Sequence, residues 1–231
     1  ETSLAITMEM LGDVEGAERI YRTSVARART SGDPEVLMSS LQNLGLCLQD
    51  QRRFDEAIPL LRENMDLTLA HFGDAHPETA ASYLNLAVAV LNEGDLDEAE
   101  ALSTRGAEIS EQAQGASHLV TLWLRANLGY VMHEQGRFQE SEALLREILG
   151  TVETVVEPGA RLPLDIRLYL VFTALSQHRN DDARREAEAR HAIVVETYSA
   201  WPDVVEREVE ATARAFEAAD LQDDAAAWRA R

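Results

Sequence analysis

The stretch Asn43-Leu44-Gly45, followed eight residues later by Arg53-Phe54-Asp55-Glu56-Ala57, decides the fold because it returns at a fixed interval. Matching triplets begin at Asn85 and Asn127, each 42 residues after the previous one. A small residue also recurs every 42 residues, as Ala57, Ala99, Ser141, Ala183 and Ala225. Self-similarity with a period between about 20 and 50 residues indicates a repeat protein, whose repeats stack on their neighbours.

Each repeat reads as two helices joined by a tight turn. Between Thr79 and Asn92 apolar residues recur at helical spacing, and Gly94 then suits a left-handed helix end. A second helix is predicted from Leu96 to about Gln112. The small residue that closes each triplet, and the alanines at the 42-residue interval, allow the paired helices to approach closely. The sequence therefore predicts an all-α fold of antiparallel helix pairs.

The triplets, the Arg-Phe-Asp-Glu-Ala stretch and the linker Phe72-Gly73-Asp74-Ala75-His76-Pro77-Glu78-Thr79 resemble tetratricopeptide repeats. The likeness is to the 42-residue variety found in kinesin light chains and in many bacterial proteins. It implies a right-handed superhelical solenoid that spans residues 1–231 as a single array. We expect repeats at 1–34 (truncated), 35–76, 77–118, 119–160 and 161–202, and a degenerate capping repeat at 203–231.

The first repeat fits a spacing of 40 residues, at which Leu4-Ala5 aligns with Leu44-Gly45. In that register Glu1 falls inside the first helix of its repeat. We therefore expect further sequence on the N-terminal side, either more repeats or another domain.

Charge limits the kinds of partner. Net charge is −20, with 41 acidic residues against 21 basic ones, and every basic residue is Arg. Such a surface repels nucleic acid and anionic lipid, so neither partner is expected, and a basic or neutral segment is favoured. We expect no membrane insertion, because no apolar run approaches the roughly 18 residues that a span requires. The only cysteine, Cys47, fits a reducing, cytoplasmic location.

Catalytic and metal-binding patterns are weak, so we expect no enzyme activity, no cofactor and no metal. His133-Glu134 begins like a zinc-protease helix, but the position of the second histidine is Arg137. His76 and His118 occupy equivalent loops, too far apart in a stacked array to share a metal ion. Cys47 lies among leucines in mid-helix and is interpreted as a small buried apolar residue.

The remaining charged clusters have structural interpretations. The acidic pairs Asp97-Glu98, Asp181-Asp182 and Asp223-Asp224 precede or begin second helices and stabilise their N-termini. A cluster of arginines alternates with acidic residues and is interpreted as a solvated, ion-paired face. Its members are Arg179, Arg184, Arg185 and Arg190.

The resemblance implies that the first helix of each repeat lines a concave inner surface. Positions two before, two after and five after the central residue of the triplet share one helical face. The predicted groove residues are Gln42, Leu46 and Gln49; Leu84, Val88 and Leu91; Ala126, Tyr130 and His133; Leu168, Phe172 and Leu175; and, on the same side, Trp123. From Leu84 to Phe172 the face is largely apolar, which is typical of an interaction site.

Asn43, Asn85 and Asn127 form a ladder that would suit a clamp on a peptide backbone, but a packing or helix-bonding role is favoured. The relatives often carry Asn two residues before the central Leu, where this chain has Gln42 and then apolar residues. The polar clamp of those relatives is therefore not expected. Binding of a C-terminal carboxylate is set aside as well, because the groove positions lack the Lys and Arg that it requires.

The sequence thus favours a non-enzymatic scaffold that binds a protein or peptide segment in an apolar concave groove. The expected segment is apolar or amphipathic, and basic residues at its edges would suit the charge. In other readings the superhelix or an N-terminal segment fills the groove, or the same residues are core. The ending also resembles the C-terminal arms of bacterial serine/threonine kinases, which implies a regulatory or substrate-recruiting role in a larger enzyme. A further alternative is a groove that serves homo-oligomerisation.

Overall fold

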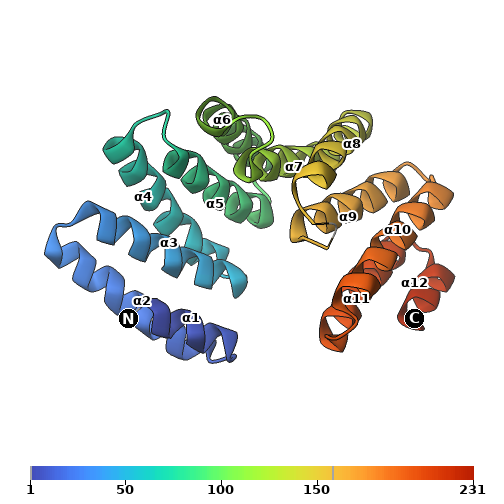
Figure 1. Cartoon of the computed structure of the whole chain (residues 1–231), viewed down its shortest axis with the longest axis horizontal. Helices are drawn as coiled ribbons and strands as arrows, with labels where there is room; N and C mark the ends of the chain where they lie inside the picture. Colours follow the sequence, from blue (N-terminus) through green and yellow to red (C-terminus); the bar gives the residue numbers. More distant parts are fainter. Residues whose placement is uncertain (1, 158) are drawn as a thin grey trace. The chain divides into compact units, whose positions relative to one another are not determined.

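The computed structural model describes residues 2–157 and 159–231, in which twelve helices and no strands are present (Figure 1). The chain divides into two compact parts, and the division falls within α7. Residues 2–127 form the N-terminal part and residues 128–231 the C-terminal part. Glu1, which the sequence places inside the first helix, lies outside the described residues. The single array over 1–231 stays a prediction.

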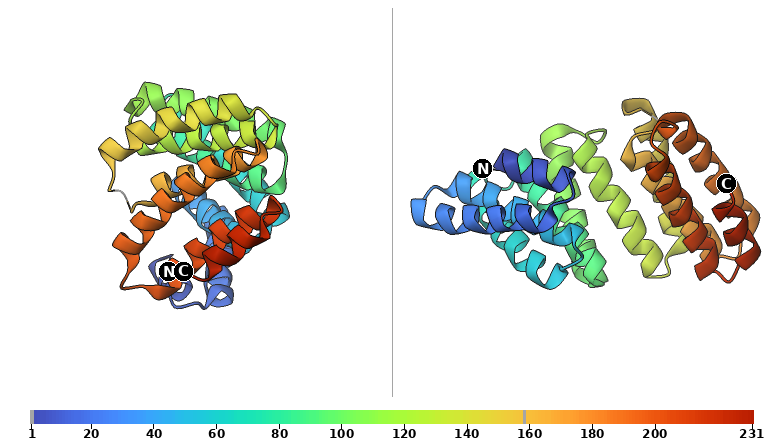
Figure 2. Two further views of the ribbon diagram at one scale, coloured as in Figure 1. Left: turned by 90° about the vertical axis from the view of Figure 1, so that its right-hand side faces the viewer. Right: turned by 90° about the horizontal axis from the view of Figure 1, so that it is seen from below.

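The N-terminal part contains three helix pairs and the start of α7. Its helices are α1 (Thr2–Met10), α2 (Val14–Ser31), α3 (Pro34–Asp50), α4 (Phe54–Phe72), α5 (Pro77–Glu93), α6 (Leu96–Gln114) and the first half of α7 (Leu119–Glu134). From α1 to α6 each helix packs against the next, and α3 also packs against α5. This pattern, visible in Figures 1 and 2, is that of stacked helix pairs.

The C-terminal part continues with the second half of α7. It also contains α8 (Phe138–Val155), α9 (Arg161–Ser176), α10 (Asn180–Tyr198), α11 (Pro202–Ala218) and α12 (Gln222–Arg229). From α8 to α12 consecutive helices pack together, and α9 also packs against α11. The all-α fold of paired helices is therefore confirmed.

The residues at the 42-residue interval explain this packing. Ala57, Ala99, Ser141, Ala183 and Ala225 have no exposed surface. Gly45, Ala87 and Gly129, which close the triplets, are buried as well. Their small side chains permit the close approach predicted from the sequence, and removal of the neighbouring Leu, Ile and Val side chains from water stabilises each pair.

The turn within each repeat places one residue in the left-handed conformation, at the same position each time. The values of φ are +85° at Gly12, +59° at Arg52, +103° at Gly94, +77° at Gly136, +57° at His178 and +61° at Asp220. Glycine adopts this backbone freely, whereas a Cβ atom clashes with the following carbonyl oxygen. Three of the six turns therefore carry a steric cost that the other three avoid.

Arginine–carboxylate pairs join successive second helices in the N-terminal part. Arg22 of α2 lies 2.7 Å from Glu56 of α4, and Arg62 of α4 lies 2.6 Å from Glu98 of α6. Glu98 belongs to an acidic pair that the sequence assigns to helix-end stabilisation alone. The structure adds a second role, since this carboxylate also holds the preceding second helix.

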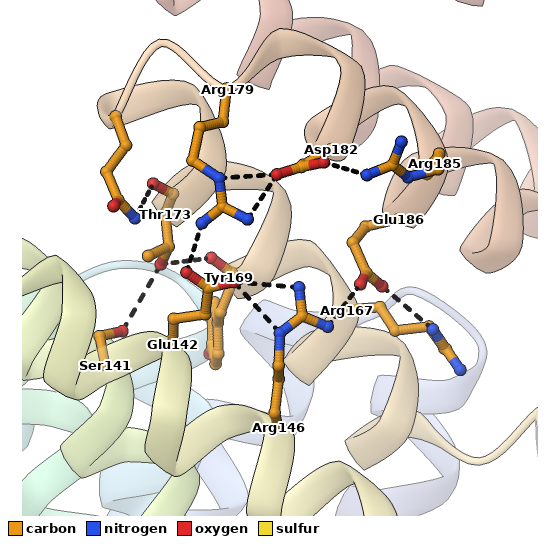
Figure 3. A network of polar contacts seen from close by, with 11 residues as sticks. Ser141, Glu142, Arg146, Arg167, Tyr169, Thr173, Arg179, Asp182, Arg185 and Glu186 are labelled. Carbon is orange, nitrogen blue, oxygen red and sulfur yellow. Dashed lines mark hydrogen bonds and ion pairs between the residues drawn. The ribbon is translucent and has the colours of Figure 1, made fainter.

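The C-terminal part repeats the arrangement as a larger network (Figure 3). Arg146 of α8 lies 3.0 Å from Glu142 and 3.0 Å from Glu186 of α10, and Arg179 lies 2.6 Å from Glu142. Burial alone would raise the pKa of Glu142, but the bonds from Arg179 and Arg146 outweigh it and lower the pKa. Arg184 and Asp224 join α10 to α12 at 2.7 Å. Each exposed pair contributes about 0–1 kcal/mol.

Arg190 corrects the prediction of a solvated arginine face. Arg184 and Arg185 are exposed, but Arg190 is 1% exposed and reaches between α9 and α11. Its guanidinium donates to Leu164 O at 3.1 Å, to Glu208 O at 3.0 Å and to the Glu208 carboxylate. The cluster therefore contains exposed arginines and one buried arginine. The alternation of charges in the sequence does not show which arginine is buried.

Candidate functional site

Capping residues determine where the first helices that carry the candidate site begin. Asp33 caps α3 by accepting the N–H groups of Glu35 and Val36, at 3.0 and 3.3 Å. In α5 the cap is His76, whose Nδ1 accepts the N–H of Glu78 at 3.2 Å, and Pro77 follows at the first helical position. His118 caps α7 in the same way through Val120. Both loop histidines therefore act as helix caps.

Five of the six predicted groove positions of α3 and α5 remain partly accessible to solvent. We use the term candidate face for these side chains, which are Gln42, Leu46 and Gln49 of α3 and Leu84 and Val88 of α5. The intervening apolar side chains of the same helices, Leu44, Leu48, Leu86 and Val90, are buried. Each first helix thus has one core side and one accessible side, as the helical period requires.

A cleft of about 300 Å³ opens at one end of this face, between α3, α4 and the start of α5. Gln42 lines it from the candidate face, together with Met38 of α3 and Phe72 of α4. Glu35 and Glu78 contribute carboxylates from two different helices. The cleft is therefore mostly polar and acidic, and it lies outside the stretch from Leu84 to Phe172 that the sequence predicts to be apolar.

Asn64 of α4 also lines the cleft and has an unpaired side-chain atom. The residue is 2% exposed, and its Nδ2 donates to Met38 O at 2.9 Å. Its Oδ1 is buried and has no hydrogen-bond partner among the described residues. A buried amide oxygen without a donor is uncommon in folded proteins, because it loses its bonds to water without replacement.

In the C-terminal part, predicted groove residues gather in an aromatic cluster. Tyr130 stacks on Tyr169 with ring centroids 4.6 Å apart, and the ring of His133 lies 6.3 Å from that of Phe172. His133 Nδ1 also lies 3.2 Å from the hydroxyl of Thr173. Burial lowers the pKa of His133, so the imidazole is neutral at neutral pH. These rings are packed on one another and only partly accessible.

Four predicted site residues belong to the core instead, among them Ala126, which has no exposed surface. Leu91 is 9% exposed, Leu175 is 5% exposed and Asn127 is 4% exposed. Leu175 joins a cluster with Ala183, Phe216 and other buried residues, because it lies on the side of α9 that faces α10 and α11. Asn43, Asn85, Trp123 and Leu168 are partly exposed, as is Phe172, which also packs against that core cluster.

The structure places Cys47 in the core, and the described residues contain no metal-binding group. Cys47 is 2% exposed, as predicted, and burial raises the pKa of its thiol to about 12. Among the described residues no group of three or more His, Cys, Asp or Glu side chains converges to hold a metal ion. None of the helices in the described part of the chain has the length and apolar character needed to cross a membrane.

Sequence reasoning missed Asn64 and Tyr169. Asn64 lies on a second helix, and the groove was assigned only to first helices. Tyr169 replaces the Asn of the triplet, so the departure from the repeat was visible, but its stacking partner could not be read from it.

The stacked helix pairs are those of a helical repeat protein, and the accessible sides of its adjacent first helices form a candidate binding face. The family model for the tetratricopeptide repeat matches residues 36–105 and 85–153, more than half of the chain. The chain belongs to the tetratricopeptide repeat family. A comparison with curated proteins gives no match.

Several solved structures share the fold. The TPR-like repeats of a Podosopora anserina protein described as a kinesin light chain are 21% identical, with a TM-score of 0.70 over 85% of this chain and 93% of that one. BtubC from P. vanneervenii is 19% identical, with a TM-score of 0.71 over 93% and 87%. A Rap protein complexed with Competence and Sporulation Factor is 10% identical, with a TM-score of 0.69 over 100% and 72%. At these identities the likeness establishes the fold alone.

Proposed function

We propose that this chain is a non-enzymatic scaffold that holds an apolar or amphipathic segment of a partner protein against the candidate face. The observation that carries the proposal is the accessibility of this face, which stays partly open on two adjacent first helices beside a cleft. The Rap protein of similar fold, solved with Competence and Sporulation Factor, gives the proposal further support.

The apolar members of the candidate face supply the expected affinity. Leu84 and Val88 are four residues apart on α5 and therefore lie on one side of it. Covering such a side chain completely contributes about 1.5–3 kcal/mol, and ordering the partner segment offsets part of that gain. Two or three such contacts give an affinity that selection experiments detect.

The test is selection of peptides from a random display library on the immobilised 231-residue chain. We expect enriched peptides with apolar residues at helical or extended spacing. The variant Leu84→Ser/Val88→Ser should weaken their binding by about tenfold, which corresponds to roughly 1.4 kcal/mol. Failure to enrich any peptide would refute the proposal.

The matched control is Leu11→Ser/Leu119→Ser, which replaces two exposed apolar residues outside the candidate face. This variant should bind the selected peptides as the original chain does. Equal weakening by both variants would mean that the library recognises exposed apolar surface in general.

Other readings of the sequence lead to separate tests. A buried Cys47 thiol is compatible with the cytoplasmic location that we propose.

Homo-oligomerisation predicts an average mass that rises with concentration in light scattering. The regulatory arm of a larger kinase stays a prediction from the resemblance.

A further inference from the structure

The cleft beside the candidate face has the chemistry of a cation site. It is lined by the carboxylates of Glu35 and Glu78, and no described residue in its lining is an Arg. Within the described part of the chain, the only ion-pair partner of either carboxylate is His71, 3.4 Å from Glu35. A partially enclosed site with two acidic groups attracts a positive charge, and the net charge of −20 draws basic segments toward it.

The unpaired Oδ1 of Asn64 supplies the second, independent observation. This buried oxygen belongs to a residue that lines the same cleft as the two carboxylates. The amide is already oriented, because its Nδ2 is bound to Met38 O. Oδ1 can therefore accept a hydrogen bond from a ligand, and a positively charged donor makes a stronger hydrogen bond than a neutral one.

The remaining lining residues suit a long aliphatic stem. Met38 is apolar and 5% exposed, and Phe72 is 36% exposed with its ring stacked on His76 at 4.4 Å. Basic side chains bury their methylene groups along such surfaces while the charged head reaches polar partners. The cleft thus offers acceptors and carboxylates for the head and apolar surface for the stem.

From these features we infer that the cleft binds the side-chain ammonium of a lysine in the partner segment. The inference rests on the proposed function and adds one specific residue to the partner. An ammonium carries three donors around one nitrogen, which suits acceptors from the three helices α3, α4 and α5. Arginine fits less well, because its planar fork favours acceptors that lie in one plane.

The occupant must come from outside these 231 residues. These 231 residues contain no Lys, so a second copy of them cannot supply the ammonium. A lysine that binds here would also fix the register of the segment, because one end of the candidate face would accept only the position that carries it.

The experiment uses the strongest peptides from the library selection on the 231-residue chain. Each lysine of a peptide is replaced in turn by norleucine, which keeps the stem and removes the charge, and by arginine. At one position we expect norleucine to weaken binding by about tenfold and arginine by less, since a charge-assisted contact is lost or distorted. In Glu35→Gln/Glu78→Gln the same replacement should change the Kd by less than about twofold.

A control variant with the same change of net charge is Glu93→Gln/Glu111→Gln, which alters two exposed carboxylates away from the cleft. It should keep the full preference for lysine over norleucine. Asn64→Leu should also lose the preference, and its melting curve shows whether it is folded.

The outcomes separate this inference from the proposed function. Selected peptides that lack lysine, or that bind equally well with norleucine, overturn the lysine site and leave the scaffold function intact. A preference for lysine that survives in Glu35→Gln/Glu78→Gln also overturns it. A library that yields no binding peptide refutes both.

Discussion

Gly45 lies directly against Leu61, so that a Cβ atom on Gly45 would stand 2.6 Å from Leu61 Cδ2. Gly129 and Leu145 make the same contact two repeats later, with a corresponding distance of 2.7 Å. Both contacts join the first helix of a repeat to the second. The glycine that closes the triplet therefore sets the distance between the paired helices.

The variant Gly45→Ala should destabilise the chain by about 1–3 kcal/mol, because the added methyl group overpacks a buried contact. Urea denaturation measures the change. The control is Gly150→Ala in α8, where a Cβ atom meets nothing within 4 Å. Alanine there should stabilise by about 0.5–1 kcal/mol, as in any exposed helix. Equal effects of the two substitutions would contradict the contact.

The left-handed turns predict a stabilising substitution. His178→Gly should raise the free energy of unfolding by about 0.5–1 kcal/mol, because relief of the Cβ clash exceeds the added freedom of the unfolded chain. His178→Ala keeps the Cβ atom and should give no gain. Thermal melts of the two variants decide the point, and a more stable Ala variant would argue against a strained turn.

Arg190 should be the most sensitive charged residue. Arg190→Met removes the buried partner of the Glu208 carboxylate, whose side chain is 11% exposed, and leaves it only the exposed Arg207 at 3.5 Å, which should cost about 3–5 kcal/mol. Arg190→Met/Glu208→Gln should recover part of the loss, since the mostly buried carboxylate is then no longer charged. Arg185→Met, at an exposed position, should change stability by less than about 0.5 kcal/mol. Similar losses for Arg185 and Arg190 in urea denaturation would be inconsistent with the buried site.

The pKa of His133 predicts a dependence of stability on pH. Burial lowers this pKa below its ordinary value of 6.5, while the charge of Glu134 acts in the opposite direction. The unfolded chain therefore binds the proton more tightly, and stability falls as the pH drops from 6.5 toward the folded pKa. Burial lowers the pKa of His191 as well, so part of the effect remains in the variant His133→Gln.

Melting temperatures between pH 7.5 and 5.5 measure this effect. The original chain should lose more stability across that range than His133→Gln does. Parallel curves for the two proteins would show that His133 does not contribute.

The helices were predictable because their causes are local. The predicted segments from Thr79 to Asn92 and from Leu96 to about Gln112 correspond to α5, Pro77–Glu93, and α6, Leu96–Gln114. Apolar spacing, Pro at a helix start and Gly at a helix end all act within a few residues. The partly open side of α3 and α5 followed from the same helical period.

The acidic cleft was not predictable, because it depends on side chains from three helices. Asn64 sits 26 residues from its partner Met38, and Glu78 approaches from the next repeat. Arg190 illustrates the same limit. The sequence around Arg190 alternates in charge as that of an exposed helix does. Its buried partner, Glu208, lies on α11, 18 residues further along the chain.

Arginine–carboxylate pairs give two of the second helices, α4 and α10, one side that accepts and one side that donates. Helix α4 accepts from α2 through Glu56 and donates to α6 through Arg62, and α10 accepts from α8 through Glu186 and donates to α12 through Arg184. A repeat of this kind therefore resembles the unit of a polymer, because its two sides carry complementary charges. Internal duplication of such a repeat would lengthen the chain while every new joint kept its charges matched.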